Sequence, residues 1–239
     1  MKALSLSILF IATHLFLFSQ ETSFIKVNTL EEATKLDSLA YLNPAFIDGT
    51  IFFKGGTKGS AKLNFNRFTN QVLFISPKGD TLAVAQPETV SWVEIGPDTL
   101  YFYQDLVLQK ITHNGLGPDL YTGQNIKLIG KEKKGAYGGY TSSGSVNSNS
   151  SVSGGRELTS QLSVDQNMIY RISTYFYLSD TVRNLYPAKK SQFFKTFPQY
   201  SKEIEDFTKA HAINFNKKND LLEIINYIQG LKSPMLLKN

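Results

Sequence analysis

Residues 49–130 alternate between apolar and polar side chains with a period of about two, and this pattern constrains the fold more than any other feature of the chain. Short runs such as TIFFKG, QVLFIS, VSWVE and TLYFYQ follow one another, separated by segments rich in Gly, Asn, Pro and Asp. In the run AKLNFN, Leu63 and Phe65 are expected to face the core. The alternate residues Lys62, Asn64 and Asn66 are expected to face water. The pattern predicts an antiparallel meander that forms a sheet or a small barrel.

A helix is predicted ahead of the strands, over residues 29–42. Thr29 is suited to cap it, and Glu32 stands three residues later as the partner in a capping box. Leu36 is one of several apolar residues that recur on one face at helical spacing. The dipeptide Asn43-Pro44 is expected to end the helix.

The C-terminal part combines one further strand with helices. Residues 168–178 (MIYRISTYFYL) are rich in β-branched and aromatic residues, which predicts a strand that returns to the sheet. The runs KKSQFFKTF, SKEIEDFTKAHA and KKNDLLEIINYIQG have helical spacing. In the last run Asn216 is expected to cap the helix and Gly230 to follow its end.

These segments together predict an α+β protein, with an antiparallel sheet or small barrel-like body, a short N-terminal helix and a C-terminal helical tail. We divide the chain into residues 1–20, a signal peptide; 21–130, the helix and β-rich body; 131–167, a loop region rich in Gly, Ser and Asn; and 168–239, the returning strand and helices. Within the loop region, residues 140–155 (YTSSGSVNSNSSVSGG) lack charge and either periodicity. They are expected to form a solvated connection, with a loop that becomes ordered over a ligand as the alternative.

The first 20 residues predict export. Lys2 precedes a mostly apolar run that ends in polar Ser19-Gln20, which is the layout of a secretory signal peptide, and cleavage is expected near Gln20. No later segment approaches the roughly 20 apolar residues of a membrane-spanning helix. The mature chain of about 219 residues is long enough to bury a core without disulfides, and it contains no Cys to form them.

Charge gives no indication of a nucleic-acid partner. Removal of Lys2 leaves 24 basic against 20 acidic residues, and the basic clusters are short and mixed with acids. A basic run with interleaved aromatic residues, as expected for nucleic-acid binding, does not occur.

The usual sequence signatures of catalysis and of metal or cofactor binding do not occur. The mature chain has two histidines, His113 and His211, and neither has a recognisable catalytic partner. Zinc, calcium and phosphate-loop motifs are not found, so no catalytic, metal or cofactor-binding residue is assigned. Glycoside hydrolysis needs two carboxylates and no motif, which leaves candidates among the acidic residues. Those considered are Asp48, Glu88, Glu94 and Asp105.

Aromatic residues are frequent in the predicted strands. They include Trp92, Tyr101, Phe102, Tyr103 and the segment 174–177. On a sheet such rings are expected to form core or cross-strand packing, with stacking on sugars as the alternative.

A tripeptide of Asp, then Ser or Thr, then an aliphatic residue occurs four times, which is more often than composition predicts. A turn Asp followed by a strand explains two of these tripeptides. The pattern also resembles the O-glycan acceptor sequence of exported Bacteroidota proteins, which would make the hydroxyl residues acceptors. These residues are Ser38, Thr81, Thr99 and Thr181.

Longer segments carry a second resemblance. The tail KKSQFFKTFPQYSKEIEDFTKAHAINFNKKNDLLEIINYIQGL and the upstream runs YLNPAFIDGTIFFKGG and FTNQVLFISPKGDTLAV resemble a group of uncharacterised exported proteins of Bacteroidota. The resemblance implies a periplasmic, outer-membrane-associated or extracellular location, and it implies no activity or site residues. We therefore expect an exported, non-catalytic envelope protein with a binding or structural role toward an unknown partner, and a glycan-binding or glycan-cleaving protein as the alternative.

Overall fold

The computed structural model describes residues 20–112, 118–134, 140–143, 166–180 and 182–236. The predicted signal peptide lies outside this range, apart from Gln20. The described part is an α+β fold, as predicted, in which antiparallel strands form one open sheet. The strands are β1 (Gln20–Val27), β2 (Ile47–Phe53), β3 (Lys58–Asn66), β4 (Gln71–Ile75), β5 (Thr81–Ala83), β6 (Val90–Ile95), β7 (Asp98–Tyr103), β8 (Leu106–Lys110), β9 (Leu120–Lys134), β10 (Tyr140–Ser143), β11 (Gln166–Ser179) and β12 (Leu185–Pro187).

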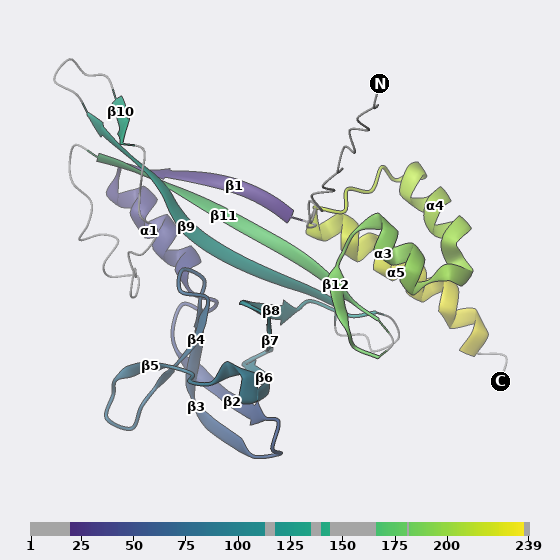
Figure 1. Cartoon of the computed structure of the whole chain (residues 1–239), viewed down its shortest axis with the longest axis horizontal. Helices are drawn as coiled ribbons and strands as arrows, with labels where there is room; N and C mark the ends of the chain where they lie inside the picture. Colours follow the sequence, from purple (N-terminus) through teal and green to yellow (C-terminus); the bar gives the residue numbers. More distant parts are fainter. Residues whose placement is uncertain (1–19, 113–117, 135–139, 144–165, 181, 237–239) are drawn as a thin grey trace, which may run out of the picture.

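The strand order is β1-β11-β9-β8-β7-β6-β2-β3-β4-β5, with β10 paired to β9 and β12 paired to β11. The path does not return from β5 to β1, so the sheet is not closed into a barrel within the described residues. Strands β2 to β9 are neighbours in nearly sequential order, whereas β11 lies between β1 and β9. The long strands β1, β11 and β9 run along one side of the molecule, and β2 to β8 extend away from them (Figure 1).

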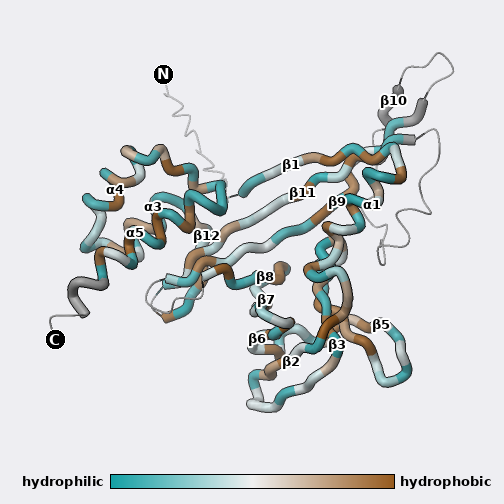
Figure 2. Tube along the Cα trace, turned by 180° about the vertical axis from the view of Figure 1, so that it is seen from behind, coloured by the Kyte–Doolittle hydropathy of each residue, from teal (hydrophilic) through white to brown (hydrophobic). Residues whose placement is uncertain are grey.

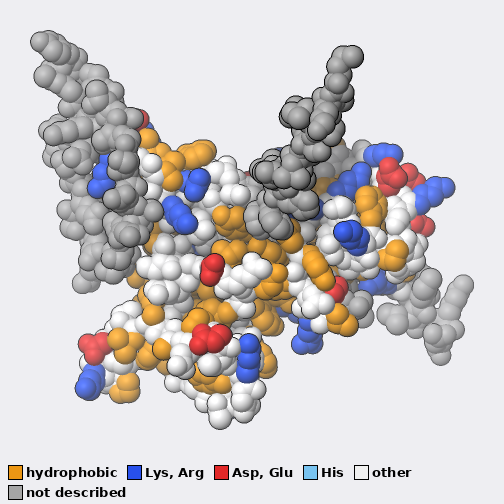
Figure 3. Space-filling view, in the orientation of Figure 1, with side chains coloured by type: hydrophobic (Ala, Val, Ile, Leu, Met, Phe, Trp, Pro, Cys, Tyr) orange, Lys and Arg blue, Asp and Glu red, His pale blue; other side chains and the backbone are white. Residues whose placement is uncertain are grey.

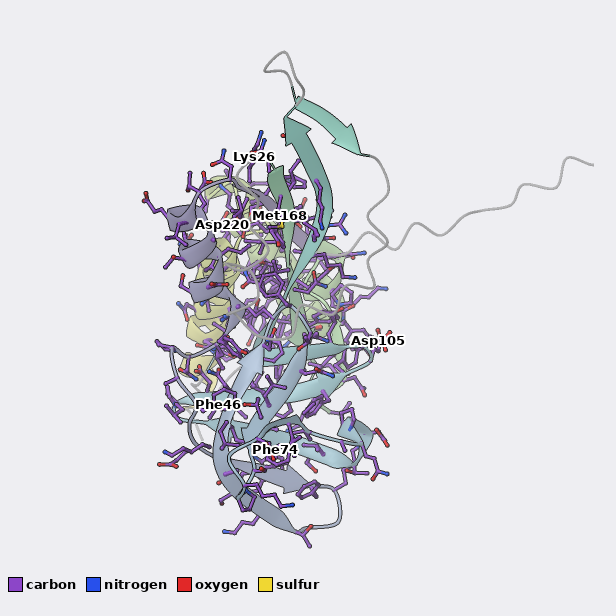
Figure 4. All side chains as sticks on the ribbon, turned by 90° about the vertical axis from the view of Figure 1, so that its left-hand side faces the viewer. Lys26, Phe46, Phe74, Asp105, Met168 and Asp220 are labelled. Atoms are coloured by element: carbon purple, nitrogen blue, oxygen red, sulfur yellow. The ribbon has the colours of Figure 1, made fainter. Side chains whose placement is uncertain are left out.

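The side view shows the same two parts of the sheet. Lys26 and Met168 lie in the upper part, which the long strands build, and Phe74 and Asp105 lie in the lower part (Figure 4). The lower part has its own apolar core, which includes Leu63, fully buried, and Phe65, 4% exposed.

The predicted N-terminal helix is present as α1 (Leu30–Ala40). The Thr29 hydroxyl accepts a hydrogen bond from the Glu32 backbone N–H at 3.2 Å, and the Glu32 carboxylate accepts one from the Thr29 N–H at 3.1 Å, which completes the capping box. The buried face of α1, with Ala33 and Leu36, packs on Tyr170 and its neighbours in the long strands.

The predicted helical tail is also present. It consists of α3 (Lys190–Thr196), α4 (Ser201–Ala210) and α5 (Lys218–Leu236), and the short 3₁₀ helices are η1 (Pro87–Thr89) and η2 (Pro198–Tyr200). The tail packs on the end of the long strands opposite to α1 (Figures 1 and 2). Ile224, Ile225 and Ile228 of α5 are fully buried there, in one cluster with Phe176 and Leu178 of β11.

Two predicted helix boundaries are wrong. The final helix continues through Gly230 to Leu236, so Gly230 does not end it. Asn216 lies ahead of α5, and its side-chain oxygen accepts a hydrogen bond from the backbone N–H of Gln20 at 3.1 Å. Asn216 therefore connects the start of β1 to the tail, while the Asp220 carboxylate accepts a hydrogen bond from the Asn214 N–H at 2.8 Å.

The predicted water-facing side of β3 is only partly exposed. Lys62 is exposed, but Asn64 is 1% and Asn66 is 2% exposed. The Asn64 amide donates to the carbonyl oxygens of Asn43 at 2.8 Å and Ala45 at 3.1 Å, which holds the connection between α1 and β2 against the sheet. This connection covers Asn64, whereas the Asn66 side-chain oxygen accepts hydrogen bonds from the backbone N–H groups of Phe68 and Thr69 in the turn after β3.

The predicted loop region 131–167 contains strand ends. Strand β9 continues to Lys134, β10 covers Tyr140–Ser143 and β11 begins at Gln166. The rest of the segment 140–155 lies outside the described residues, so its predicted role as a solvated connection stays a prediction.

Candidate functional site

A cleft lies where the two parts of the sheet separate. Strands β8 and β9 share only two residue pairs, one of which joins Gln109 to Thr122. Farther along β9, the Ile126 N–H donates a hydrogen bond to the carbonyl oxygen of Arg67 at 3.1 Å, just after β3 ends. Between these contacts opens a cavity of about 290 Å³, which takes residues from β1, β3, β8, β9, β11 and α5. The cleft thus joins segments from both ends of the chain.

The floor of the cleft is polar, although the same face of the sheet is apolar on either side. Thr122 and Gln124 line the cleft between the buried residues Leu120 and Ile126 of β9. On β11, Thr174 lines it beside Phe176. Two apolar clusters therefore flank a polar strip, one under α1 and the other under the helical tail.

The polar groups of the floor are ordered by hydrogen bonds to each other and to neighbours. The Gln124 amide donates to the Thr174 hydroxyl oxygen at 3.1 Å. The Gln109 amide donates to the Asp98 carboxylate at 2.7 Å. Each glutamine keeps its carbonyl oxygen and a second amide hydrogen for other partners, since these are the remaining hydrogen-bonding groups of the side chain.

Arg67 forms part of the wall and also completes the end of α1. Its guanidinium donates to the carbonyl oxygens of Leu39, at 3.0 Å, and of Tyr41. Carbonyl groups in the last turn of a helix lack partners within the helix, and a cation there is favourable. Burial lowers the pKa of the Arg67 guanidinium, and the nearby Asp98 carboxylate opposes that shift. A guanidinium is not deprotonated in proteins, so Arg67 is a cation in this wall.

The charged residues that line the cleft are Glu21, Arg67 and Lys218. Glu21 is the only carboxylate among its described lining residues. The four acids considered from the sequence lie elsewhere. Asp48 is exposed and pairs with Lys62 at 3.3 Å, and Glu94 accepts a hydrogen bond from the Trp92 ring N–H at 3.1 Å. Glu88 is exposed on η1, and Asp105 lines a second cavity together with residues of β4, β7 and β8. The structure does not bring two of these acids together in either cavity.

The predicted cross-strand packing of aromatic residues is present. Five tyrosines form a cluster, here called the tyrosine cluster, on the face of the sheet opposite to the cleft. Its members are Tyr101, Tyr103, Tyr121, Tyr175 and Tyr177. The rings of Tyr101 and Tyr121 meet edge to face at 5.4 Å, and those of Tyr103 and Tyr177 at 5.3 Å. The rings are not coplanar, so they do not form a flat platform for stacking a sugar. Hydrophobic side chains reach the surface in the centre of the molecule (Figure 3).

The four Asp-containing tripeptides have different structural roles. Ser38 is exposed on α1 and Thr81 is exposed on β5, whereas Thr99 is half-buried on β7. Thr181 lies outside the described residues. Asp180, beside it, accepts hydrogen bonds from the backbone N–H groups of Val182 and Asn184, as a turn residue does. O-glycosylation of any of the four stays a prediction.

His211 is not among the described residues that line the cleft. His113 lies outside the described residues. His211 is exposed at the end of α4, where its Nδ1 lies 2.7 Å from a carboxylate oxygen of Glu223 and its ring stacks on Phe207 at 4.1 Å. No group of three or more His, Cys, Asp or Glu suited to a metal ion occurs within the described residues.

Comparison with protein-family models, with curated proteins and with solved structures gives no match. In the part of the chain that the structure describes, no helix is both long and apolar enough to cross a membrane. The cleft therefore has to be interpreted from its own residues. Thr122 and Gln124 were not singled out from the sequence, although polar residues at inward positions of an otherwise apolar strand were a usable signal.

Proposed function

We propose that this chain is an exported, non-catalytic protein of the cell envelope that binds a partner protein through the outer edge of its sheet. The signal-like residues 1–20 support export. The edge of β1 supports the partner. Within the described residues β1 pairs with β11 on one side only, and most of its residues are exposed.

An unpaired strand edge presents backbone N–H and C=O groups that another chain can extend as an added strand. Phe24, in the middle of β1, is 62% exposed and offers apolar area next to that edge. Lys26 does not point freely from the edge, because its ammonium group lies 2.7 Å from a carboxylate oxygen of Glu132 on β9. The single observation that carries the proposal is thus an eight-residue edge strand with an exposed aromatic ring at its centre.

Photocrosslinking in cells tests this proposal. A benzophenone amino acid replaces Phe24 in one variant and Leu82 in a matched control, because Leu82 is 47% exposed on β5 at the opposite end of the strand order. The Phe24 variant is expected to give a discrete protein adduct that the Leu82 variant does not give. Identical adducts from both positions, or none from Phe24, would contradict the proposal.

Export has its own test, which uses the start of β1. The Gln20 N–H is bound by Asn216, and β1 begins at Gln20, so cleavage near this residue keeps the strand. N-terminal sequencing of protein from the envelope fraction is expected to begin at Gln20 or Glu21. An unprocessed chain in the cytosol would show that the chain is not exported.

Glycan binding is the second candidate, and the polar floor of the cleft is the observation that favours it. Hydroxyl and amide groups such as those of Thr174 and Gln124 both donate and accept hydrogen bonds, as sugar hydroxyls require. Glycan cleavage has less support, because hydrolysis uses two carboxylates and Glu21 is the only one among the described lining residues. Hydrolysis of a panel of cell-wall and plant glycans by the folded protein would refute the non-catalytic proposal.

A further inference from the structure

The cleft combines three features that restrict its ligand: its size, its neutral polar floor and its charge. The volume of about 290 Å³ lies just below the range for small-molecule sites, which is about 300 to 1,000 Å³. A single sugar ring fits this size, whereas a long oligosaccharide exceeds it.

The floor is polar at positions where apolar side chains would match the sheet on either side. Leu120 and Phe176, on the same face of the sheet, are at most 1% exposed and contribute apolar burial. An apolar residue at Thr122 or Gln124 would extend that burial, because each buried CH₂ group contributes about 0.8 kcal/mol. Polar side chains at these positions are consistent with a space that holds hydrogen-bonding groups.

The hydrogen bonds of the floor leave a defined set of groups for a ligand. The Thr174 oxygen accepts from Gln124, so its hydroxyl hydrogen can be donated elsewhere. Gln109 is fixed in the same way by Asp98 and retains its carbonyl oxygen. The floor therefore offers both donors and acceptors, which matches several neighbouring hydroxyl groups on one molecule.

The charge of the lining favours an anion. Among the described lining residues Arg67 and Lys218 are cationic and Glu21 is anionic. The Asp98 carboxylate is not a lining residue, and it accepts a hydrogen bond from the Gln109 amide. Apolar atoms of Leu42, Phe65 and Val107 line the remaining surface and suit the C–H groups of a ring.

From these features we infer that the cleft is a binding site for a small acidic sugar, a single ring that carries several hydroxyl groups and one carboxylate. The carboxylate lies toward Arg67 and Lys218, and the ring hydroxyls lie over Gln109, Gln124 and Thr174. Strand β1 contributes only Glu21 to the described lining of the cleft, and Phe24, which carries the edge proposal, is not a lining residue, so either proposal can fail alone.

Calorimetry with glucuronate and galacturonate as probes tests the inference. Glucose, which lacks the carboxylate, and inorganic phosphate, which lacks the hydroxyls, are the comparison ligands. We expect saturable binding of at least one sugar acid, at least about tenfold tighter than glucose, since hydrogen bonds to a charged group are the stronger ones. Equal binding of glucose, or phosphate binding as tight as that of the acids, would refute the assignment.

Paired variants locate the site. Gln124→Leu and Thr174→Val are expected to weaken binding about three- to tenfold each, since each removes hydrogen-bonding groups. Gln199→Leu is the matched control, because Gln199 is exposed on η2 away from the cleft. Lys218→Met is expected to weaken binding most at low salt, whereas Lys202→Met on α4 leaves it unchanged.

Side-chain amide NMR gives a readout that a loss of stability does not mimic. Addition of the sugar acid is expected to shift the amide resonances of Gln109 and Gln124 in the unmodified protein and to leave that of Gln199 unchanged. Binding that shifts none of the cleft amide resonances would overturn the inference. The absence of saturable binding of either sugar acid up to about 10 mM would also overturn it, because specific sites usually bind at lower concentrations.

Discussion

Asn64→Ala is expected to lower the free energy of unfolding by about 2 to 3 kcal/mol. The side chain is 1% exposed and makes three hydrogen bonds to the connection between α1 and β2. Its amide donates to the carbonyl oxygens of Asn43, at 2.8 Å, and Ala45, at 3.1 Å, and its oxygen accepts from the Asn43 N–H at 3.1 Å. At about 1 kcal/mol for each hydrogen bond the sum is about 3 kcal/mol, which water entering at the partly buried connection reduces slightly.

Equilibrium unfolding in urea measures this change. Trp92, the single tryptophan of the chain, is partly buried on β6 in the lower part of the sheet, where it stacks on Phe52 at 4.6 Å, and it reports unfolding by fluorescence. The midpoint is expected to fall while the slope with urea concentration stays constant, which is the signature of a stability change without a change in exposed surface.

Two further variants separate the causes. Asn64→Asp keeps the acceptor oxygen but places a carboxylate against two carbonyl oxygens, so it is expected to cost at least as much as Asn64→Ala at pH 7 and less at pH 3. Lys62→Ala on the same strand removes only an exposed ion pair with Asp48 and is expected to change stability by less than about 0.5 kcal/mol. If Asn64→Ala costs no more than Lys62→Ala, the connection is not held by these hydrogen bonds.

Three other substitutions test the packing around the same region. Burial raises the pKa of Asp37, so the contribution of this one group to stability is fully present below the unfolded value of 3.8 and is lost as the pH rises through the folded pKa. Asp37→Asn is therefore expected to gain stability at pH 7 and to gain nothing at pH 3 in urea unfolding, and an equal gain at both pH values would contradict this. A Cβ at Gly49 would lie 2.5 Å from a carbonyl oxygen of the adjacent strand, so Gly49→Ala is expected to lower the free energy of unfolding by about 1 to 3 kcal/mol, measured as a lower melting temperature. Gly55→Ala is the control, because a Cβ at Gly55 would have no atom within 4 Å. Leu36→Ala is expected to cost about 2 to 5 kcal/mol in urea unfolding because Leu36 is fully buried, in contrast to Leu30→Ala at a residue that is 68% exposed.

Local patterns predicted the secondary structure well where the local signal and the tertiary environment agree. Alternation identified the strands of the lower part, and the capping box located the start of α1 because both of its residues act within one turn. The predicted helix end at Gly230 is wrong because packing of the buried isoleucines stabilises α5. The helix therefore continues past Gly230, although glycine has a low helix propensity. Strand β1 was missed because its exposed edge position leaves it without clear apolar alternation.

The cleft could not be predicted because no local pattern brings its residues together. Glu21 and Lys218 lie near opposite ends of the chain, and they meet at the cleft only because β1 and β11 are adjacent and the tail packs on the end of β11. Asn64 was predicted to face water for a similar reason. Alternation assigns a side to each residue, but it does not indicate which later segment covers that side.

The pairing of β1 with β11 also bears on the order in which the molecule is assembled. Gln20 lies opposite Tyr175, so the first strand has no neighbour until nearly three quarters of the polypeptide has been synthesised. Pairings between residues so distant in sequence form slowly, because a long loop must close first. A chain paired in this way completes its sheet late, which is compatible with the proposed export through a narrow translocation channel before the final shape is adopted.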